Sequence, residues 1–181
     1  ARNADDLLQG FAEQGDFDIP PNLTVGLAWE ILPTFTLVFD VQRIYFEKIK
    51  SIANQGDMVF QPGSILLGTD DGLGFGWEDT TIGKLGLQWQ WRPDVVLRAG
   101  YSLSEQVISG EQALFNILAP AVVTEHYTCG LTKTLAKKEI NISLMYAPGE
   151  KVTGRNPNTG SQSGTLEMEQ FEFEVSFSFL F

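Results

Sequence analysis

The stretch that decides the fold is residues 169–181, which read EQFEFEVSFSFLF. Apolar side chains take every second position, and five of them are phenylalanines: Phe171, Phe173, Phe177, Phe179 and Phe181, with Val175 in the same series. Glutamine, glutamate and serine fill most of the positions between. A period of two predicts a β-strand with one apolar and one polar face. A small soluble core rarely has room for so many rings from one strand.

The same alternation occurs seven times along the 181 residues. No stretch approaches the ~18 apolar residues that a spanning helix needs, whereas each alternating run is close to the ~9–11 residues of a tilted strand that crosses a bilayer. The alternation therefore predicts strands near 22–31, 34–45, 81–91, 94–103, 123–135, 138–146 and 169–181.

Short and long connections alternate strictly between these runs. The short ones are 32–33, 92–93 and 136–137, and the long ones are 46–80, 104–122 and 147–168. Outer-membrane barrels have short periplasmic turns and long external loops. The pattern therefore predicts an all-β, antiparallel transmembrane β-barrel; a soluble sandwich or lipocalin-like barrel is the alternative.

Aromatic residues gather near the strand ends, as the interfacial girdles of a membrane barrel require. Expected near the short turns are Trp29, Trp89, Trp91 and Phe179, and near the long loops Tyr45, Tyr101, Tyr127 and Tyr146. Three charges on the apolar faces also lie towards strand ends, where they cost little: Arg43, Glu125 and Lys133.

Composition excludes several classes of function. The net charge of -11 argues against nucleic acid, which needs a basic surface. A single cysteine, Cys129, excludes an internal disulfide framework and a cysteine-based metal site. His126 is the only histidine, and no serine is spaced to form a nucleophilic pair with it, so we expect no enzyme, no metal and no cofactor.

Seven strands with two open edges are not stable in lipid, because every backbone polar group there must be paired. Bacterial single-chain barrels usually have an even number of strands, from 8 upwards. We therefore expect further strands on the N-terminal side, with residues 1–21 as the tail of another external loop. Closure of one barrel by two copies of the chain is the alternative.

An ordered series of short motifs from residue 76 onwards resembles the FadL/TodX family of outer-membrane transporters for long-chain fatty acids and aromatic hydrocarbons. The matching residues are Trp77-Glu78-Asp79, Lys84-Leu85-Gly86, Leu97-Arg98-Ala99-Gly100-Tyr101, Leu118-Ala119-Pro120, and His126 with Gly130. The resemblance is weaker before residue 76.

This resemblance implies a 14-stranded barrel, plugged by an N-terminal hatch, of which the chain is the C-terminal half. It also implies passive uptake of hydrophobic compounds across a Gram-negative outer membrane, in contact with its lipid and lipopolysaccharide. The hatch and the kinked strand of the lateral opening belong to the other half, so they are not carried over. A general porin and a structural barrel without ligand are the alternatives.

The polar faces would line the lumen, and three of their residues are candidate ligand contacts: Lys84, Arg98 and His126. A fatty-acid carboxylate needs a cation that offsets its desolvation. Alternatively, the two cations pair with lumen acids such as Asp40, Asp94 or Glu172, and His126 makes a structural hydrogen bond.

Loop 46–80 is unusually apolar and supplies a second candidate site. Its hydrophobic side chains form either an external landing site for substrates or a seal over the barrel mouth. The candidates are Phe60, Ile65, Leu66, Leu67 and Phe75. Loop 147–168 is polar and rich in turn residues, which predicts a solvent-exposed loop.

Overall fold

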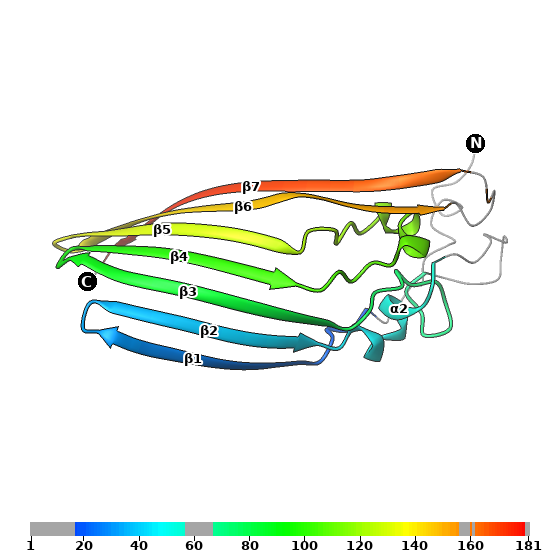
Figure 1. The fold of residues 1–181 in the computed structure, drawn as a ribbon, viewed down its shortest axis with the longest axis horizontal. Helices are drawn as coiled ribbons and strands as arrows, with labels where there is room; N and C mark the ends of the chain where they lie inside the picture. The colour runs from blue at the N-terminus through cyan, green and yellow to red at the C-terminus, as the bar shows by residue number, and fades with distance from the viewer. Residues whose placement is uncertain (1–16, 57–66, 156–159, 161, 180–181) are drawn as a thin grey trace.

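Seven strands lie side by side in one antiparallel sheet, in chain order, in a computed structural model that describes residues 17–56, 67–155, 160 and 162–179 (Figure 1). This confirms the all-β antiparallel fold. The strands are β1 (Asn22–Leu32), β2 (Phe35–Ile44), β3 (Thr80–Arg92), β4 (Val95–Ser104), β5 (Glu125–Leu135), β6 (Lys138–Arg155) and β7 (Ser163–Phe179). No helix in the described part of the chain is long and apolar enough to span a membrane.

The connections separate to opposite ends of the sheet (Figure 1). Tight turns join β1 to β2, β3 to β4 and β5 to β6, and Ala136 takes a left-handed φ of 50° in the last of them. In their described parts, the long connections at the other end hold four single-turn helical segments: η1 (Phe46–Lys48), α2 (Lys50–Ala53), η2 (Gly110–Gln112) and η3 (Phe115–Ile117).

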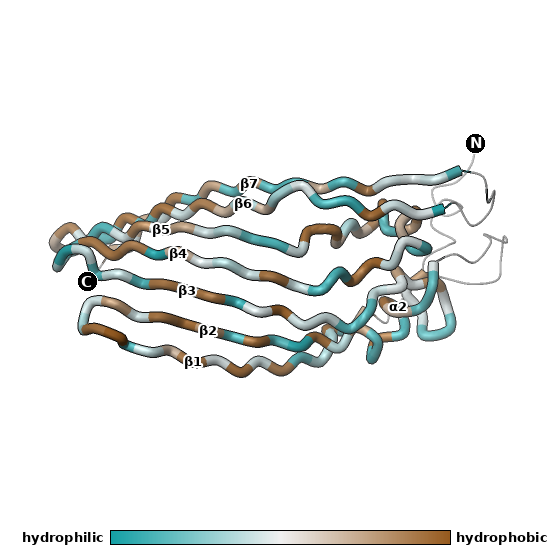
Figure 2. The backbone as a smooth tube through the Cα atoms, in the orientation of Figure 1, coloured by the Kyte–Doolittle hydropathy of each residue, from teal (hydrophilic) through white to brown (hydrophobic). Residues whose placement is uncertain are grey.

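The pairing register aligns apolar side chains in rows across one face of the sheet, and Figure 2 shows the alternation along each strand. One row near the loop end consists of Leu27, Phe39, Leu85, Tyr101, Tyr127, Tyr146 and Phe171. This face stays open among the described residues: Phe171 and Phe177 are 71% and 67% exposed. A soluble sandwich would cover these rings with a second layer, so the open face argues against that alternative.

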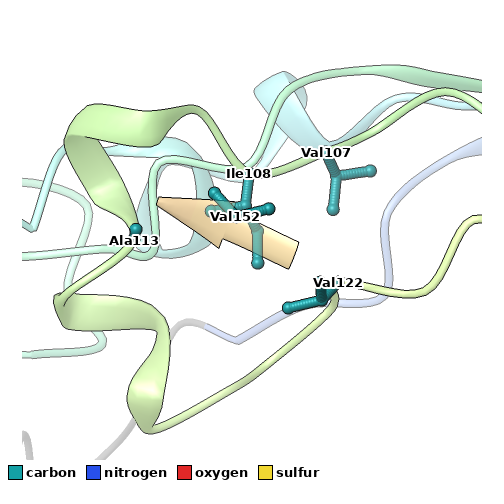
Figure 3. Packing of buried hydrophobic residues seen from close by; sticks show 5 residues of the cluster. All are labelled: Val107, Ile108, Ala113, Val122 and Val152. Carbon is teal, nitrogen blue, oxygen red and sulfur yellow. The ribbon is translucent and has the colours of Figure 1, made fainter. Parts of the chain in front are cut away.

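The buried apolar cluster lies at the loop end of the molecule, where the connection between β4 and β5 meets the end of β6. It contains Val107, Ile108, Ala113, Val122 and Val152, which converge in Figure 3. Half-buried residues packed around it include Phe46, Trp77, Leu166 and Met168. Four of the five buried residues come from the connection between β4 and β5, so this small core holds the loop end of the molecule together.

The last two strands correct the expected exposed loop at 147–168. β6 continues to Arg155 and β7 begins at Ser163, so most of that segment is a hairpin extension. A β-bulge lies between Ala147 and Glu150, where β6 has one residue more than its partner strand. Because side chains alternate with period two, one extra residue exchanges the two faces of β6 beyond this point.

The remaining boundaries lie within two residues of the expected ones, apart from the N-terminal tail. β5 begins at Glu125, and β2 ends at Ile44. Tyr45 follows β2, and its backbone N–H donates to the Pro21 carbonyl at 2.9 Å. Of the expected external tail 1–21, only residues 17–21 are described.

Candidate functional site

The polar face of the sheet carries the candidate ligand contacts in rows fixed by the register. One row crosses five strands and consists of Gly26, Asp40, Lys84, Ser102 and His126. The next consists of Ala28, Val38, Gly86, Gly100, Thr128, Met145 and Glu172, and the third of Glu30, Thr36, Gln88, Arg98, Gly130, Ser143 and Glu174. Lys84, Arg98 and His126 therefore share one face.

Lys84 and Asp40 are cross-strand neighbours, yet they do not form an ion pair. The Lys84 ammonium donates to the Gln42 Oε1 at 2.8 Å. The Asp40 carboxylate leans over Gly26 on the other side, where an added Cβ would lie 2.0 Å from its Oδ1. A hollow of about 270 Å³ lies along this row, lined by Lys84, His126 and eight further residues.

Arg98 is held by neutral groups. Its Nε donates to the Gln88 Oε1 at 2.9 Å, and its Nη1 donates to the Thr132 hydroxyl at 2.7 Å. That hydroxyl in turn donates to the Asn141 Oδ1 at 2.6 Å, so the chain of hydrogen bonds spans β3 to β6. A second hollow of about 410 Å³ lies beside Arg98.

The two hollows adjoin over a floor of small residues, and we call them together the wall trough. Both are lined by Val38, Gly86, Gly100 and Thr128. The floor depends on glycine, because a Cβ at Gly100 would lie 2.5 Å from the Thr128 hydroxyl oxygen. The wall trough therefore has a floor of small and mainly apolar residues, with Lys84 and Asp40 towards one end and Arg98 towards the other.

The prediction that Lys84 and Arg98 form ion pairs with acids on the polar face is wrong for the described residues. None of their ion pairs includes Lys84 or Arg98, and Asp94 pairs with Lys133 instead. His126 lines the wall trough without a hydrogen bond to another described side chain, so the expected structural bond is also not found. The described part of the chain holds no group of three acidic, histidine or cysteine side chains arranged for a metal ion.

The second candidate site is described only in part. Phe60, Ile65 and Leu66 lie outside the described residues, and Leu67 is half-buried. Phe75 is half-buried among three rings, with centroids 6.0 Å from Phe17 and 5.9 Å from both Trp77 and Phe115. The described side chains of this loop therefore pack on one another.

Sequence reasoning missed Asn116, the polar centre of the loop end. Its side chain is fully buried, accepts from the Trp77 indole N–H at 2.7 Å, and donates to the Phe75 carbonyl at 2.7 Å. A single asparagine in a loop carries no sequence signal of this role, because its partners lie about 40 residues away.

Charged groups at the two ends of the sheet have perturbed acidities. A hydrogen bond from Lys133 lowers the pKa of Asp94, which lies in a tight turn. At the loop end, hydrogen bonds from the Thr81 backbone N–H and hydroxyl, with the nearby Arg43 guanidinium, lower the pKa of Glu105. Arg43 bonds the same Glu105 carboxylate at 3.1 Å.

Solved structures of three channels share this architecture. The match to the toluene transporter TodX of Pseudomonas putida has a TM-score of 0.64 and 22% identity, and covers 91% of this chain and 35% of TodX. The monoaromatic hydrocarbon channel CymD gives 0.56 and 19%, covering 91% and 36%. The toluene transporter TbuX of Ralstonia pickettii gives 0.56 and 15%, covering 92% and 35%.

Neither a protein-family model nor the sequence of a curated protein matches this chain. The chain spans about a third of the length of the channels it matches. It therefore has the fold of one part of these channels, and the FadL/TodX-like character indicated by its sequence motifs is confirmed at the level of the fold.

Proposed function

We propose that this chain forms part of the wall of a Gram-negative outer-membrane channel for passive uptake of hydrophobic compounds. The observation that carries the proposal is the two-faced sheet: an open apolar face suited to lipid, and a polar face that bears an apolar-floored trough. The shared fold with two toluene transporters and a monoaromatic hydrocarbon channel supports it. Lipid and lipopolysaccharide contact the apolar face, and further strands and a hatch complete the barrel.

Long-chain fatty acids and aromatic hydrocarbons are the proposed substrates, and the wall trough is their proposed path. Its floor accepts an apolar body, while Lys84 and Arg98 donate hydrogen bonds to a carboxylate. The two cations are two rows apart, about 13 Å along the strands at ~3.3 Å per residue. One carboxylate therefore meets Lys84 and Arg98 in succession, and His126 lies near the first contact.

A role for the external loop 46–80 as a landing site for substrates remains a prediction. Its members are Phe60, Ile65, Leu66, Leu67 and Phe75, and a landing role requires that they are reached from solvent. For Phe75 the ring packing favours the sealing alternative instead.

Uptake of labelled fatty acid and of toluene by liposomes that hold the complete protein tests the proposal. We expect uptake above that of empty liposomes for at least one of the two compounds. Lys84→Gln and Arg98→Gln should lower fatty-acid uptake and leave toluene uptake unchanged, because toluene has no charge to pair. Lys137→Gln is the matched control, since Lys137 is exposed in the tight turn after β5.

Two other functions predict different results. A general porin would conduct small ions in planar bilayers and would not discriminate between hydrophobic and polar solutes. A structural barrel would give neither uptake nor conductance. Uptake equal to that of empty liposomes for both compounds would refute the channel.

A further inference from the structure

The extension of β6 and β7 beyond the bulge supports the external loops from one side. On β7, Leu166 and Met168 share their face with Gln170 and Glu172, which belong to the polar face of the sheet, and they pack against the buried loop cluster. Val152 joins the same cluster from β6 (Figure 3), because the bulge exchanges the two faces of that strand. The loops therefore lie on the same side of the sheet as the wall trough.

The connection between β4 and β5 packs directly against this extension, so that its backbone contacts the backbone of β6. An added Cβ at Gly154 of β6 would lie 1.6 Å from the Gly110 carbonyl oxygen, so no side chain fits between them. Ala113 is 1% exposed beside this contact. The docking depends on glycine at position 154 and leaves little freedom for η2 to move.

The connection between β2 and β3 is joined to the β4–β5 connection in several places. Trp77 and Ile108 form an antiparallel bridge, and the Glu78 N–H donates to the Val107 carbonyl at 3.0 Å. The Gly56 N–H donates to the Gln112 Oε1 at 2.7 Å. With the two bonds of Asn116, these contacts link both connections through backbone and buried side chains.

A third attachment ties the loops to the strand ends. The Arg43 guanidinium at the end of β2 lies 3.7 Å from the Asp79 carboxylate and 3.1 Å from that of Glu105. Asp79 also accepts a hydrogen bond from the Glu47 N–H at 3.0 Å. The two ends of the β2–β3 connection therefore meet the start of the β4–β5 connection at Glu105.

We propose that the outer cap, defined as residues 45–56, 67–79, 105–124, 150–155 and 163–168, is a fixed cover above the wall trough. A moving lid belongs to the weakly bonded parts of a structure, whereas this cap is held by an extension, an inter-loop bridge and an ionic cluster. Solutes therefore pass around the margin of the outer cap and do not displace it. The inference rests on the proposed channel function.

A disulfide across the Trp77–Ile108 bridge tests this, in the complete protein with Cys129 replaced by alanine. Side chains of directly opposed antiparallel residues have Cβ atoms about 4.5–5.5 Å apart, near the ~3.5–4.5 Å of a disulfide. We expect Trp77→Cys/Ile108→Cys to show the same uptake when oxidised as when reduced. A several-fold loss of uptake on oxidation, restored by reductant, would overturn the fixed cover.

Two controls separate the possible failures. The single variants Trp77→Cys and Ile108→Cys report the effect of each substitution without the crosslink. If the unmodified protein takes up no more than empty liposomes, the channel proposal fails, and the uptake route around the cap fails with it.

Hydrogen exchange of the unmodified protein tests the cap without any substitution. The Gly56, Phe75 and Glu78 amides donate within the outer cap, so we expect them to exchange as slowly as amides in the paired strands. Exchange of these three amides as fast as that of an unstructured peptide, while the strand amides remain protected, would show an opening cap and refute the inference.

Discussion

Two neighbouring substitutions on β6 test which face of the sheet meets lipid. Ile142 lies on the apolar face, is 37% exposed, and is four residues from both Lys138, where β6 begins, and Tyr146, which is expected in the outer girdle. Ser143 lies on the polar face, opposite Glu174 of β7. We compare Ile142→Arg with Ser143→Arg, which introduce the same side chain on opposite faces.

The expected magnitude follows from depth. Eight steps from Lys138 to Tyr146 span about 26 Å along the strand at ~3.3 Å per residue, and a tilt of ~35–45° reduces this to about 20 Å, comparable with the ~25 Å apolar band of such barrels. In the proposed membrane orientation Ile142 is therefore near the midplane, where arginine costs about 2–4 kcal/mol. That cost lowers the folding equilibrium constant roughly 30- to 700-fold, since each ~1.4 kcal/mol is a factor of ten.

Ser143→Arg should change stability by less than about 1 kcal/mol, because its guanidinium reaches water and the Glu174 carboxylate. Urea titration of the complete protein in phospholipid vesicles, followed by tryptophan fluorescence and by heat-modifiable migration in gels, measures both free energies of unfolding. Equal destabilisation by the two variants, or a greater loss from Ser143→Arg, would refute the assignment of the apolar face to lipid.

Three further measurements test other parts of the structure. Gly154→Val should loosen the outer cap by about 1–3 kcal/mol through overpacking and expose the 105–124 connection to limited proteolysis, whereas Gly83→Val should not, since open space surrounds Gly83. The Lys133 hydrogen bond lowers the pKa of Asp94 in the folded protein. The ionised Asp94 therefore stabilises the fold fully above the ordinary aspartate pKa, and this stabilisation is lost as the pH falls through the lowered pKa of the folded protein. The urea midpoint should therefore fall less on acidification in Asp94→Asn than in the unmodified protein. A fluorophore on the exposed, apolar-face Cys129 should be quenched by lipid-borne nitroxide, and one on Thr128→Cys in a Cys129→Ala background should not; equal quenching at both sites would count against the lipid-facing assignment.

Alternation was enough to predict five of the strands within two residues of their bounds, because in β1 to β5 one face is mainly apolar and its charges, such as Arg43 and Lys133, lie only near strand ends. Residues such as Leu23, Val25 and Leu27 repeat with one phase, and nothing in the strand interrupts it. Where the environment of both faces is constant, period two alone fixes the strand and its orientation.

The same reasoning failed where the environment changes along one strand. In β7, Phe171 is exposed on the apolar face, but Leu166 and Met168 lie on the opposite face beneath the loops. A search for one phase of alternation therefore ends near residue 169 and assigns the rest to a loop. Locating the extension required knowledge of the loop packing, which depends on contacts between segments far apart in sequence.

The sequence was enough to predict which face of the sheet carries the candidate site residues, but not which side chains they contact. Period two placed Lys84, Arg98 and His126 on one side, yet the choice of partner depends on the register and on the direction in which each side chain leans. Asp40 turns towards the space above Gly26, and Lys84 turns to Gln42. Neither choice follows from the sequence, because charge attraction alone favours a Lys84–Asp40 pair.

The bulge between Ala147 and Glu150 links these observations physically. Below it the outward face of the β6–β7 hairpin suits lipid, with Tyr146 and Phe171 as its last rings. Above it the outward face carries a Lys151–Glu167 ion pair and suits water, while the inner face carries Val152 and Leu166 against the loops. On β7 the alternation keeps one phase, and the residue types on each face change along the strand. On β6 the single added residue of the bulge moves the apolar residues from the outward face to the inner face. The outer boundary of the apolar band and the foundation of the outer cap are therefore set at the same place in the hairpin.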